Sequence, residues 1–501
     1  MKKIKLFARI TALMLVFLMA FSAISCSKDE AAETDTDTEA VSTDAVETGY
    51  VDTFNVPDVD YGGKTFNILI RSGIEHSSDL GANIDPEEGL TTSHSMVDRA
   101  VYERNKTIEN QFNISFKFYK EDNEAAVYNT LINSMSMPDA YDLVANHGLK
   151  TFDAIIAGCG VDWNTLEWVN LNNSWWNQSV RTNWATPAGA VYAMNGDLSY
   201  MSIGNNSGIF WNKTIFNDVT GLTTPLEHVK AGTWTYANFK QTIISIDAAM
   251  DGDGTGNPAT DSFAYATQRY RGPSVIVPST GAQWLVINNT TGMYELDIDS
   301  SRVIDAVQDY VALAKSSYTY YSSQGIGTSG TGTRAIFLAG RAAMTEDNVK
   351  NVSEFSKNGL NFGLVPNYKY DDLGTVPSVI GSGTNTFMVP NSTTEENRTR
   401  ISVILEAMAY YGQKDVIKAY YNQVLQYQAS PTDDDRQMLV EIHDSAIVSF
   451  AEYLNPGDVT FMVYKIIEGD YSDVSSALPT VKGLALADLD GWMQVDSKMK
   501  N

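Results

Sequence analysis

Oxygen-bearing side chains alternate with small residues between positions 251 and 261. An EF-hand calcium loop places such side chains at its first, third and fifth positions and a glycine at its sixth, a place that Gly256 fills here. The twelfth position is Ser262, where these loops carry a bidentate Glu, so Asp261 would have to substitute for it. The segment therefore predicts either a structural calcium site or a plain Asp/Gly turn. The candidate ligands are Asp251, Asp253, Thr255, Asn257 and Asp261.

Arrangements for covalent or metal-dependent catalysis are missing from the sequence. It contains no Gly-x-Ser-x-Gly elbow and no His-Glu-x-x-His motif, and its five histidines are scattered. A glycoside hydrolase needs two carboxylates about 5 to 10 Å apart, and 61 acidic residues make chance pairs unavoidable. We therefore expect a binding protein without catalysis. A secreted glycan-active enzyme and a glycan-binding surface protein without a transport role remain the alternatives.

The N-terminus has the pattern of a secretory signal. Lys2, Lys3, Lys5 and Arg9 precede an apolar run from Ile10 to Phe21, which is too short to span a membrane. Small residues then lead to Cys26, so residues 1–25 predict a lipoprotein signal peptide and Cys26 its lipidation site. An ordinary secretory signal with an incidental Cys is the alternative. Two acyl chains would hold the protein stably on the outer face of the cytoplasmic membrane.

Residues 26–61 predict an acidic, disordered tether. Between Ser27 and Asp60 there are eleven acidic residues, one Lys and little apolar mass. Removal of the four basic residues of the signal would change the net charge from −26 to −30. Such a surface disfavours nucleic acid and anionic lipid as partners. With Cys26 acylated, only Cys159 remains, so no intrachain disulfide can form.

Strands and helices alternate at the start of the folded part. Strands are predicted near 65–70, 113–119 and 141–145, and amphipathic helices over 95–112 and 123–135. This β-α-β-α-β order predicts a parallel sheet, whose ligands lie beyond the carboxyl ends of its strands. Arg71, His76, Asn146 and His147 stand at or just beyond those ends.

Helices dominate the C-terminal part. Apolar residues at helical spacing predict helices over 396–411, 413–425 and 433–453. The Gly/Ser/Thr stretch 324–333 contains a formal Gly-x-Gly-x-x-Gly pattern, but it opens no clean βαβ unit and predicts a loop rather than a nucleotide site.

Four short motifs occur together in one order. They are Phe210–Phe216 (FWNKTIF), Gly232–Tyr236 (GTWTY), Phe337–Met344 (FLAGRAAM) and Phe362–Pro366 (FGLVP). In type and order the set resembles the sugar-binding extracellular solute-binding proteins of bacterial ABC importers, over residues 62–453. The resemblance implies an α/β, two-lobed periplasmic-binding-protein-like fold of type II with a hinge between the lobes. It also implies a monomer that captures a carbohydrate, and membrane permease subunits as partners.

Mapped by these motifs, the first lobe is expected over 62–203 plus 347–388. The second is expected over 204–346 plus 389–501. The resemblance places the ligand between the lobes, where closure would trap it. Relatives often carry an Asp/Gly loop near 251–261, which favours the calcium alternative.

Carbohydrate ligands need aromatic faces and hydrogen-bonding rims. Five of the nine Trp lie between Trp163 and Trp184, and Trp163 beside Asp162 has this chemistry. Packing in the first lobe is the alternative for these side chains. Together with Arg71 at a strand end and Trp234 in the second motif, Trp163 is predicted to line the cleft.

Polar residues also stand where the resemblance implies that the chain crosses between lobes. They are Asn205, Asn206, Glu346 and Asp347. On hinge strands these side chains can face a ligand from the floor of the cleft, and we predict that they bind it. Solvated linker residues are the alternative.

Overall fold

The computed structural model describes residues 52–250, 257, 259–288, 290–323, 332–426 and 432–499. The predicted signal peptide, the Cys26 lipidation site and three candidate calcium ligands, Asp251, Asp253 and Thr255, lie outside these residues. So does most of the predicted 324–333 loop.

The first lobe is built on a four-stranded sheet with the order β12-β3-β1-β2. β1 pairs in parallel with β2 and β3, and β12 joins β3 in the antiparallel sense. The strands are β1 (Lys64–Arg71), β2 (Ile114–Glu121), β3 (Leu143–His147) and β12 (Asn385–Met388). The parallel arrangement predicted for the first three strands is confirmed.

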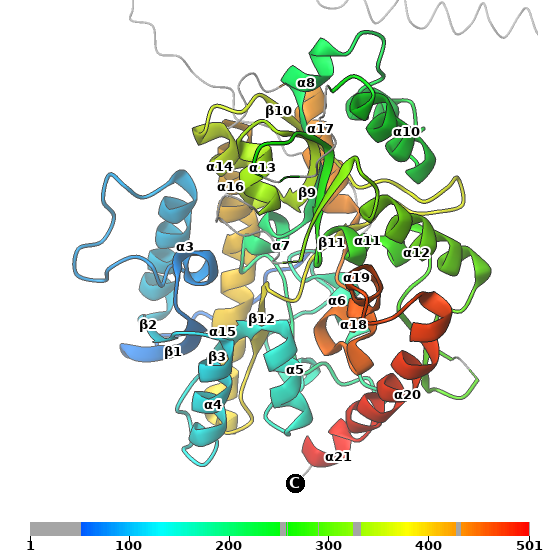
Figure 1. Ribbon diagram of the computed structural model, residues 1–501. Coiled ribbons are helices and arrows are strands. Elements are labelled where there is room, and N and C mark those ends of the chain that lie inside the picture. The colour runs from blue at the N-terminus through cyan, green and yellow to red at the C-terminus, as the bar shows by residue number, and fades with distance from the viewer. Residues whose placement is uncertain are drawn as a thin grey trace, which may run out of the picture. The chain divides into compact units, whose positions relative to one another are not determined.

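A five-stranded sheet with the order β10-β4-β9-β5-β8 forms the second lobe. β5 is parallel to β8 and β9, whereas β4 is antiparallel to β9 and β10. The strands are β4 (Ser207–Asn212), β5 (Phe263–Gln268), β8 (Thr319–Ser322), β9 (Ala342–Asn348) and β10 (Phe362–Val365). Figure 1 shows the two sheets in separate parts of the molecule.

Helices cover both sheets (Figure 1). The first lobe carries α2 (Ile74–Ser77), α3 (Met96–Phe112), α4 (Glu124–Ser134), α5 (Gly148–Ile156), α6 (Gln178–Asn183) and α15 (Glu395–Tyr411). The second carries α8 (Lys213–Asp218), α9 (Pro225–Lys230), α10 (Tyr236–Asp247), α11 (Gly272–Ser279), α12 (Ser301–Ala314), α13 (Thr333–Leu338), α14 (Val352–Lys357) and α17 (Asp433–Asp444). The local sequence determines where several of these helices begin. At α3, the Ser95 side chain accepts a hydrogen bond from the Asp98 N–H, and the Asp98 carboxylate accepts one from the Ser95 N–H, which together form a capping box.

Short elements connect the lobes. Between β3 and β4 lies α7 (Met201–Gly204), and β11 (Ser378–Val379) pairs with β13 (Ala446–Ile447) where the chain returns. A small hairpin of β6 (Leu285–Ile287) and β7 (Tyr294–Leu296) extends from the second lobe.

A C-terminal run of helices contacts both lobes. α18 (Phe450–Leu454) packs on α5, whereas α19 (Met462–Glu468) and α20 (Val474–Met493) pack on α12. Between α18 and α19 the chain forms η5 (Pro456–Phe461), and α21 (Val495–Met499) follows α20. In α21 the Asp496 carboxylate accepts hydrogen bonds from Thr186 and Tyr192 of the first lobe, both at 2.9 Å.

Strand pairing corrects the predicted lobe boundaries. Residues 347–388 were expected to lie in the first lobe, but β10 pairs with β4 in the second sheet, and the chain returns to the first sheet only at β12. Residues 389–501 were expected to lie in the second, but α15 covers the first, where Arg400 donates to the Asp142 carboxylate at 2.8 Å. The order of the motifs gives only a rough position for the points where the chain crosses between the lobes. Hydrogen bonds between strands far apart in the sequence determine those points.

The last part of the predicted tether is folded. Phe54 stacks on Tyr410 with ring centroids 4.0 Å apart, and the Ser174 N–H donates to the Asp52 carboxylate at 2.7 Å. Acidic composition predicted disorder up to Asp60, and that was wrong from Asp52 onward because Phe54 supplies an apolar anchor.

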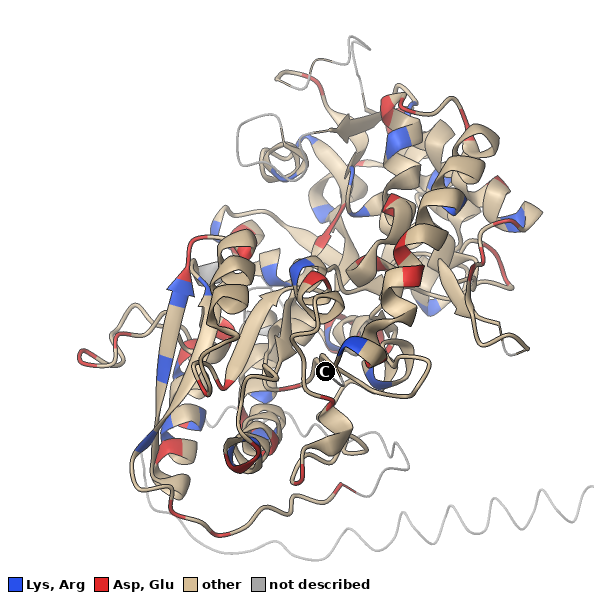
Figure 2. Ribbon diagram, turned by 90° about the horizontal axis from the view of Figure 1, so that it is seen from below, with Lys and Arg blue, Asp and Glu red and all other residues tan. Residues whose placement is uncertain are grey.

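Two predicted helix boundaries also differ. Gly412 does not separate helices: α15 continues through a π-helical turn, η4 (Gly412–Ile417), into α16 (Lys418–Gln426). The single helix predicted over 433–453 is instead α17, β13 and α18. Within the described part of the chain, no helix is both long and apolar enough to cross a membrane. Lys and Arg are interspersed with Asp and Glu over both lobes (Figure 2).

Candidate functional site

A cavity of about 330 Å³ lies between the two lobes. His147 and Leu149 from the end of β3 and the start of α5 line one side, and Arg269, Tyr270, Arg271 and Ser274 after β5 line another. Residues 381–383, before β12, and Glu452, Thr460 and Phe461 from the C-terminal helices complete the lining. The site thus lies where the carboxyl ends of parallel strands from both sheets meet, as ligand sites of such sheets do.

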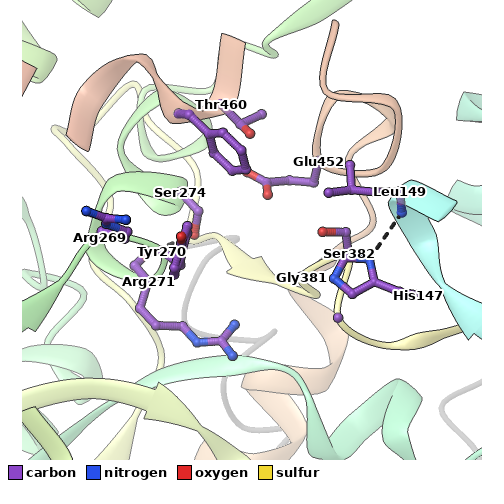
Figure 3. A pocket seen from close by; sticks show the side chains of 12 residues that line it. His147, Leu149, Arg269, Tyr270, Arg271, Ser274, Gly381, Ser382, Glu452 and Thr460 are labelled. Atoms are coloured by element: carbon purple, nitrogen blue, oxygen red, sulfur yellow. Dashed lines mark hydrogen bonds between the residues drawn. The ribbon is translucent and has the colours of Figure 1, made fainter. Parts of the chain in front are cut away.

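Arg271 and Glu452 present opposite charges to this space. Figure 3 shows both side chains reaching into the cavity from different sides. Nε of Arg271 and Oε1 of Glu452 are buried, and neither atom has a hydrogen-bond partner among the described residues. Burial raises the pKa of the Glu452 carboxyl to about 7, against the opposing effect of Arg271. A ligand that supplied an acceptor to one group and a donor to the other would remove the cost of two unsatisfied buried groups.

His147 adds a neutral donor. Its Nδ1 accepts a hydrogen bond from the Leu149 N–H at 3.2 Å, and Figure 3 shows the other ring nitrogen turned toward the cavity. Burial, assisted by the charge of Arg71, lowers the pKa of the His147 imidazole to about 4. The ring is therefore uncharged at neutral pH, and with Nδ1 accepting, the proton is assigned to Nε2.

Arg71 lies next to the cavity and holds one of its lining loops in place. Its Nη2 donates to the Gly383 carbonyl at 2.7 Å and to Asn385 Oδ1 at 3.1 Å, so it fixes the loop that lines the cavity. Burial lowers the pKa of its guanidinium to about 10. The structure places Arg71 at the site, as the strand-end rule predicted, but next to the lining rather than in it.

Three rings gather at one edge of the cavity, and we call Tyr270, Phe461 and Tyr464 the aromatic mouth. Tyr270 lies 5.9 Å from Phe461 and 5.7 Å from Tyr464 between ring centroids, and it is 48% exposed. The guanidinium of Arg269 lies over Tyr464 at 4.9 Å and also pairs with Glu468. These half-exposed faces can stack on the apolar face of a sugar ring.

The two tryptophans predicted to line the cleft lie in the core instead. Trp163 has no exposed surface and packs edge-on against Trp176, with ring centroids 5.5 Å apart. Trp234 is buried, and its Nε1 donates to the Pro366 carbonyl at 2.9 Å. The alternative of packing in the first lobe therefore describes Trp163, and Trp234 is a core residue of the second lobe. Composition could not separate the two roles because aromatic residues serve both.

The four hinge residues predicted to bind ligand are brought together, but they do not line the cavity. Asn205, Asn206, Glu346 and Asp347 are all buried, which contradicts the solvated-linker alternative, and none of them lines the cavity. Asn348 Nδ2 donates to Asn205 Oδ1 at 3.2 Å and Ser378 to Asn206 Oδ1 at 3.2 Å. Asp347 pairs with Arg334 at 2.9 Å. These contacts tie β4, β9 and the returning chain into a fixed hinge floor.

Glu346 is the exception on this floor. Neither of its carboxylate oxygens has a partner on another described residue, although the side chain is only 2% exposed. Burial raises the pKa of this carboxyl well above its usual value. The buried carboxyl therefore lowers the free energy of unfolding at neutral pH.

The segment 269–271 could have been found from the sequence because it directly follows β5, just as His147 stands at the carboxyl end of β3. Glu452, Thr460 and Phe461 had no such signal, since only packing of the C-terminal helices brings them to the cavity.

Two of the five candidate calcium ligands are described. The Asn257 N–H donates to Asp261 Oδ2 at 2.8 Å, and Arg341 donates to the Asp261 carbonyl at 2.8 Å. Within the described ranges, no group of three His, Cys, Asp or Glu side chains is placed to hold a metal ion.

Comparison with known proteins identifies the fold. No family model matches the chain, and no curated protein matches it in sequence. Among solved structures, the cyclic α-maltosyl-1,6-maltose binding protein of Arthrobacter globiformis matches with a TM-score of 0.56 and 14% identity, over 85% of this chain and 99% of that one. The GacH receptor of Streptomyces glaucescens, solved unliganded and with acarbose, matches with a TM-score of 0.55 and 11% identity, over 85% of this chain and 99% of that one.

UgpB of Mycobacterium tuberculosis, solved with glycerophosphocholine, matches with a TM-score of 0.54 and 13% identity, over 86% of this chain and 98% of that one. The chain therefore has the two-lobed α/β fold of the solute-binding proteins, as the four sequence motifs implied.

Proposed function

We propose that this protein is a carbohydrate receptor of an ABC importer that holds an oligosaccharide in the cavity between its lobes. The observation that carries the proposal is the composition of that cavity. A guanidinium whose buried Nε has no partner, a carboxyl whose buried Oε1 has none, and a half-exposed aromatic mouth meet there, at the strand ends of both sheets. Sugar hydroxyls both donate and accept, and sugar rings stack on aromatic faces, so one ligand class meets all three features.

Residue roles follow from this geometry. Arg271 and His147 Nε2 donate to ring hydroxyls, Glu452 accepts from them, and Tyr270 with Phe461 stacks on a ring face. Arg71 positions the loop 381–383. Closure of the lobes is favoured because only the closed form contacts the ligand from both sides.

The test is a panel of oligosaccharides screened by thermal shift. A ligand at about 100 times its dissociation constant stabilises the folded protein by about 2.7 kcal/mol. For the sugar that binds, Tyr270→Ala should weaken binding by about 1 to 3 kcal/mol, a range taken from alanine substitution of aromatic residues that stack on nucleic-acid bases. Tyr102→Ala on α3 is the matched control and should bind normally. If the Tyr270→Ala protein bound the sugar as tightly as the unmodified protein, the aromatic mouth would not be part of the binding site.

An enzyme would behave differently in the same panel. Glu452 is the one carboxylate among the described residues that line the cavity, whereas glycoside hydrolysis needs two. Incubation with each glycan should therefore return it intact. If the unmodified protein shortened a glycan and the Glu452→Gln protein did not, the protein would be a hydrolase rather than a receptor.

The same proposal includes delivery to a membrane permease by a protein anchored through Cys26. The support is the lipoprotein-like start of the sequence, followed by an acidic stretch. Cys26→Ser should move the protein from the membrane fraction to the soluble fraction without changing its melting temperature. If Cys26→Ser still sediments with membranes, the anchor is not at this residue.

We also propose a structural calcium ion at residues 251–261. The spacing of Asp251, Asp253, Thr255, Asn257 and Asp261 supports it. Chelator should lower the melting temperature of the unmodified protein and leave that of Asp253→Ala unchanged. Equal melting of the unmodified protein with and without chelator would leave a plain turn.

A further inference from the structure

The cations around the cavity stand out because the chain is strongly acidic. The protein carries 61 Asp and Glu against 35 Lys and Arg, yet the described lining holds two arginines and one carboxylate. A third arginine, Arg71, lies directly behind the loop 381–383. The local balance of charge is thus the reverse of the overall balance.

Two of these arginines already have partners. Arg269 is paired with Glu468, with Nε to Oε1 at 3.0 Å, and Arg71 donates to the loop carbonyl of Gly383. Nε of Arg271 is buried without a partner, as Nε of Arg71 is, but the Arg271 guanidinium makes no hydrogen bond or ion pair with a described residue. Its acidic neighbour Asp347 is held by Arg334 at 2.9 Å.

Glu452 neutralises Arg271 only in part. Burial raises the pKa of its carboxyl to about 7, so near neutral pH part of the protein carries no charge there. His147 contributes a donor without charge on the same cavity wall. Part of the positive charge of Arg271 therefore stays uncompensated in the cavity, and a neutral sugar would not neutralise it.

A carboxylate fits this arrangement best. The planar fork of a guanidinium binds a carboxylate through two parallel hydrogen bonds, which is stronger and more directional than its contact with hydroxyls. Tyr270 and Phe461 would still stack on the ring that carries the acid group.

We propose that the ligand is an acidic carbohydrate, an oligosaccharide containing a uronic acid, whose carboxylate is held by Arg271. This inference rests on the proposed function and names the substrate class of the same site. Arg271 is then the residue that sets specificity between acidic and neutral sugars.

The experiment compares uronate oligomers with their own neutral counterparts. Oligomers of galacturonate, glucuronate and mannuronate are titrated calorimetrically, each beside its methyl ester and the neutral parent oligomer. The ester keeps the ring and removes the charge. For at least one series, the acid should bind about tenfold or more tightly than both neutral forms, as a charge-assisted hydrogen bond predicts.

Arg271→Gln should remove that preference by weakening only the acid, because the amide keeps a donor but not the charge. Arg436→Gln, on the exposed side of α17, is the matched control for the lost charge and should keep the preference. Melting of both variants without ligand shows that they are folded.

The outcomes separate the two proposals. Neutral oligomers that bind as tightly as the acids would overturn the acidic ligand and leave the carbohydrate receptor standing. If the Arg271→Gln protein still bound the acidic oligomers more tightly than the neutral ones, Arg271 would not be the residue that holds the carboxylate. Failure of every neutral and acidic oligomer to bind would overturn the carbohydrate receptor itself.

Discussion

At the scale of residues, burial rather than residue type separates the site from the core. Trp163 and Tyr270 both have faces suited to a sugar, but Trp163 has no exposed surface and Tyr270 is 48% exposed. Among the acidic residues, Asp347 is paired with Arg334, whereas Glu346 is buried with no partner on another described residue. Each difference gives a prediction that does not depend on the ligand.

Trp163→Ala should destabilise the protein by about 3 to 5 kcal/mol, the usual cost of removing a large buried aromatic side chain. Urea denaturation measures it. Trp168→Ala, at a half-buried Trp of the same segment, should cost less. A Trp163→Ala protein that kept its stability but lost glycan binding would restore the stacking role that the sequence suggested.

Glu346→Gln should stabilise the protein at pH 8 by about 1 kcal/mol or more, because the amide stays uncharged without taking up a proton, whereas each unit by which the carboxyl pKa is raised corresponds to about 1.4 kcal/mol. Because the pKa of Glu346 is raised in the folded state, its share of stability is fully present below the unfolded pKa of about 4.3 and is lost as pH rises through the folded value. The gain should therefore be much smaller at pH 5. The exposed Glu103→Gln is the control and should show no such dependence on pH. An equal gain at both pH values would contradict the buried charge.

At the scale of elements, close approach of backbones decides where helices can continue. A Cβ added at Gly412, where α15 enters η4, would lie 1.9 Å from the Asp197 carbonyl oxygen. The glycine that the sequence suggested as a helix separator is therefore required by packing, and the helix runs through it.

Gly412→Ala should destabilise the protein by about 1 to 3 kcal/mol or more, as overpacking does. Gly483→Ala within α20 is the matched control, since an added Cβ there meets nothing within 4 Å. It should stabilise the helix by up to about 1 kcal/mol. Thermal and urea unfolding of the two variants measure the difference, and equal effects would contradict the close approach at Gly412.

At the scale of the whole molecule, the cavity is assembled from distant parts of the chain. His147 belongs to the first lobe, Arg271 to the second, and Glu452 to the C-terminal helices that contact both. Ligand contacts on all three parts would hold the lobes together, which connects binding to hinge closure.

Addition of a bound oligosaccharide should therefore reduce the radius of gyration in small-angle X-ray scattering. Arg271→Gln at the same sugar concentration should show a smaller change, because fewer molecules are occupied. An unchanged radius in the fully occupied protein would mean that the ligand binds without closure.

The sequence by itself determined the local elements and the class of fold. Alternating apolar runs and amphipathic helices gave the parallel β1–β2–β3 arrangement, Ser95 began α3, and four motifs implied the two-lobed fold. The strand-end rule led to His147 and to the position of Arg71. The local elements follow from interactions between residues close in the chain, which composition and spacing record, whereas the two-lobed fold was implied by the resemblance to a known family.

Only the tertiary structure decided which side chains form the site. The lobe to which β10 belongs, the burial of Trp163 and Trp234, and the arrival of Glu452 and Phe461 at the cavity depend on contacts between residues hundreds of positions apart. A Trp suited to a sugar is equally suited to a core, and a lone Glu in a C-terminal helix carries no local signal. Long-range packing sets burial, and burial in turn determines which groups remain available to a ligand.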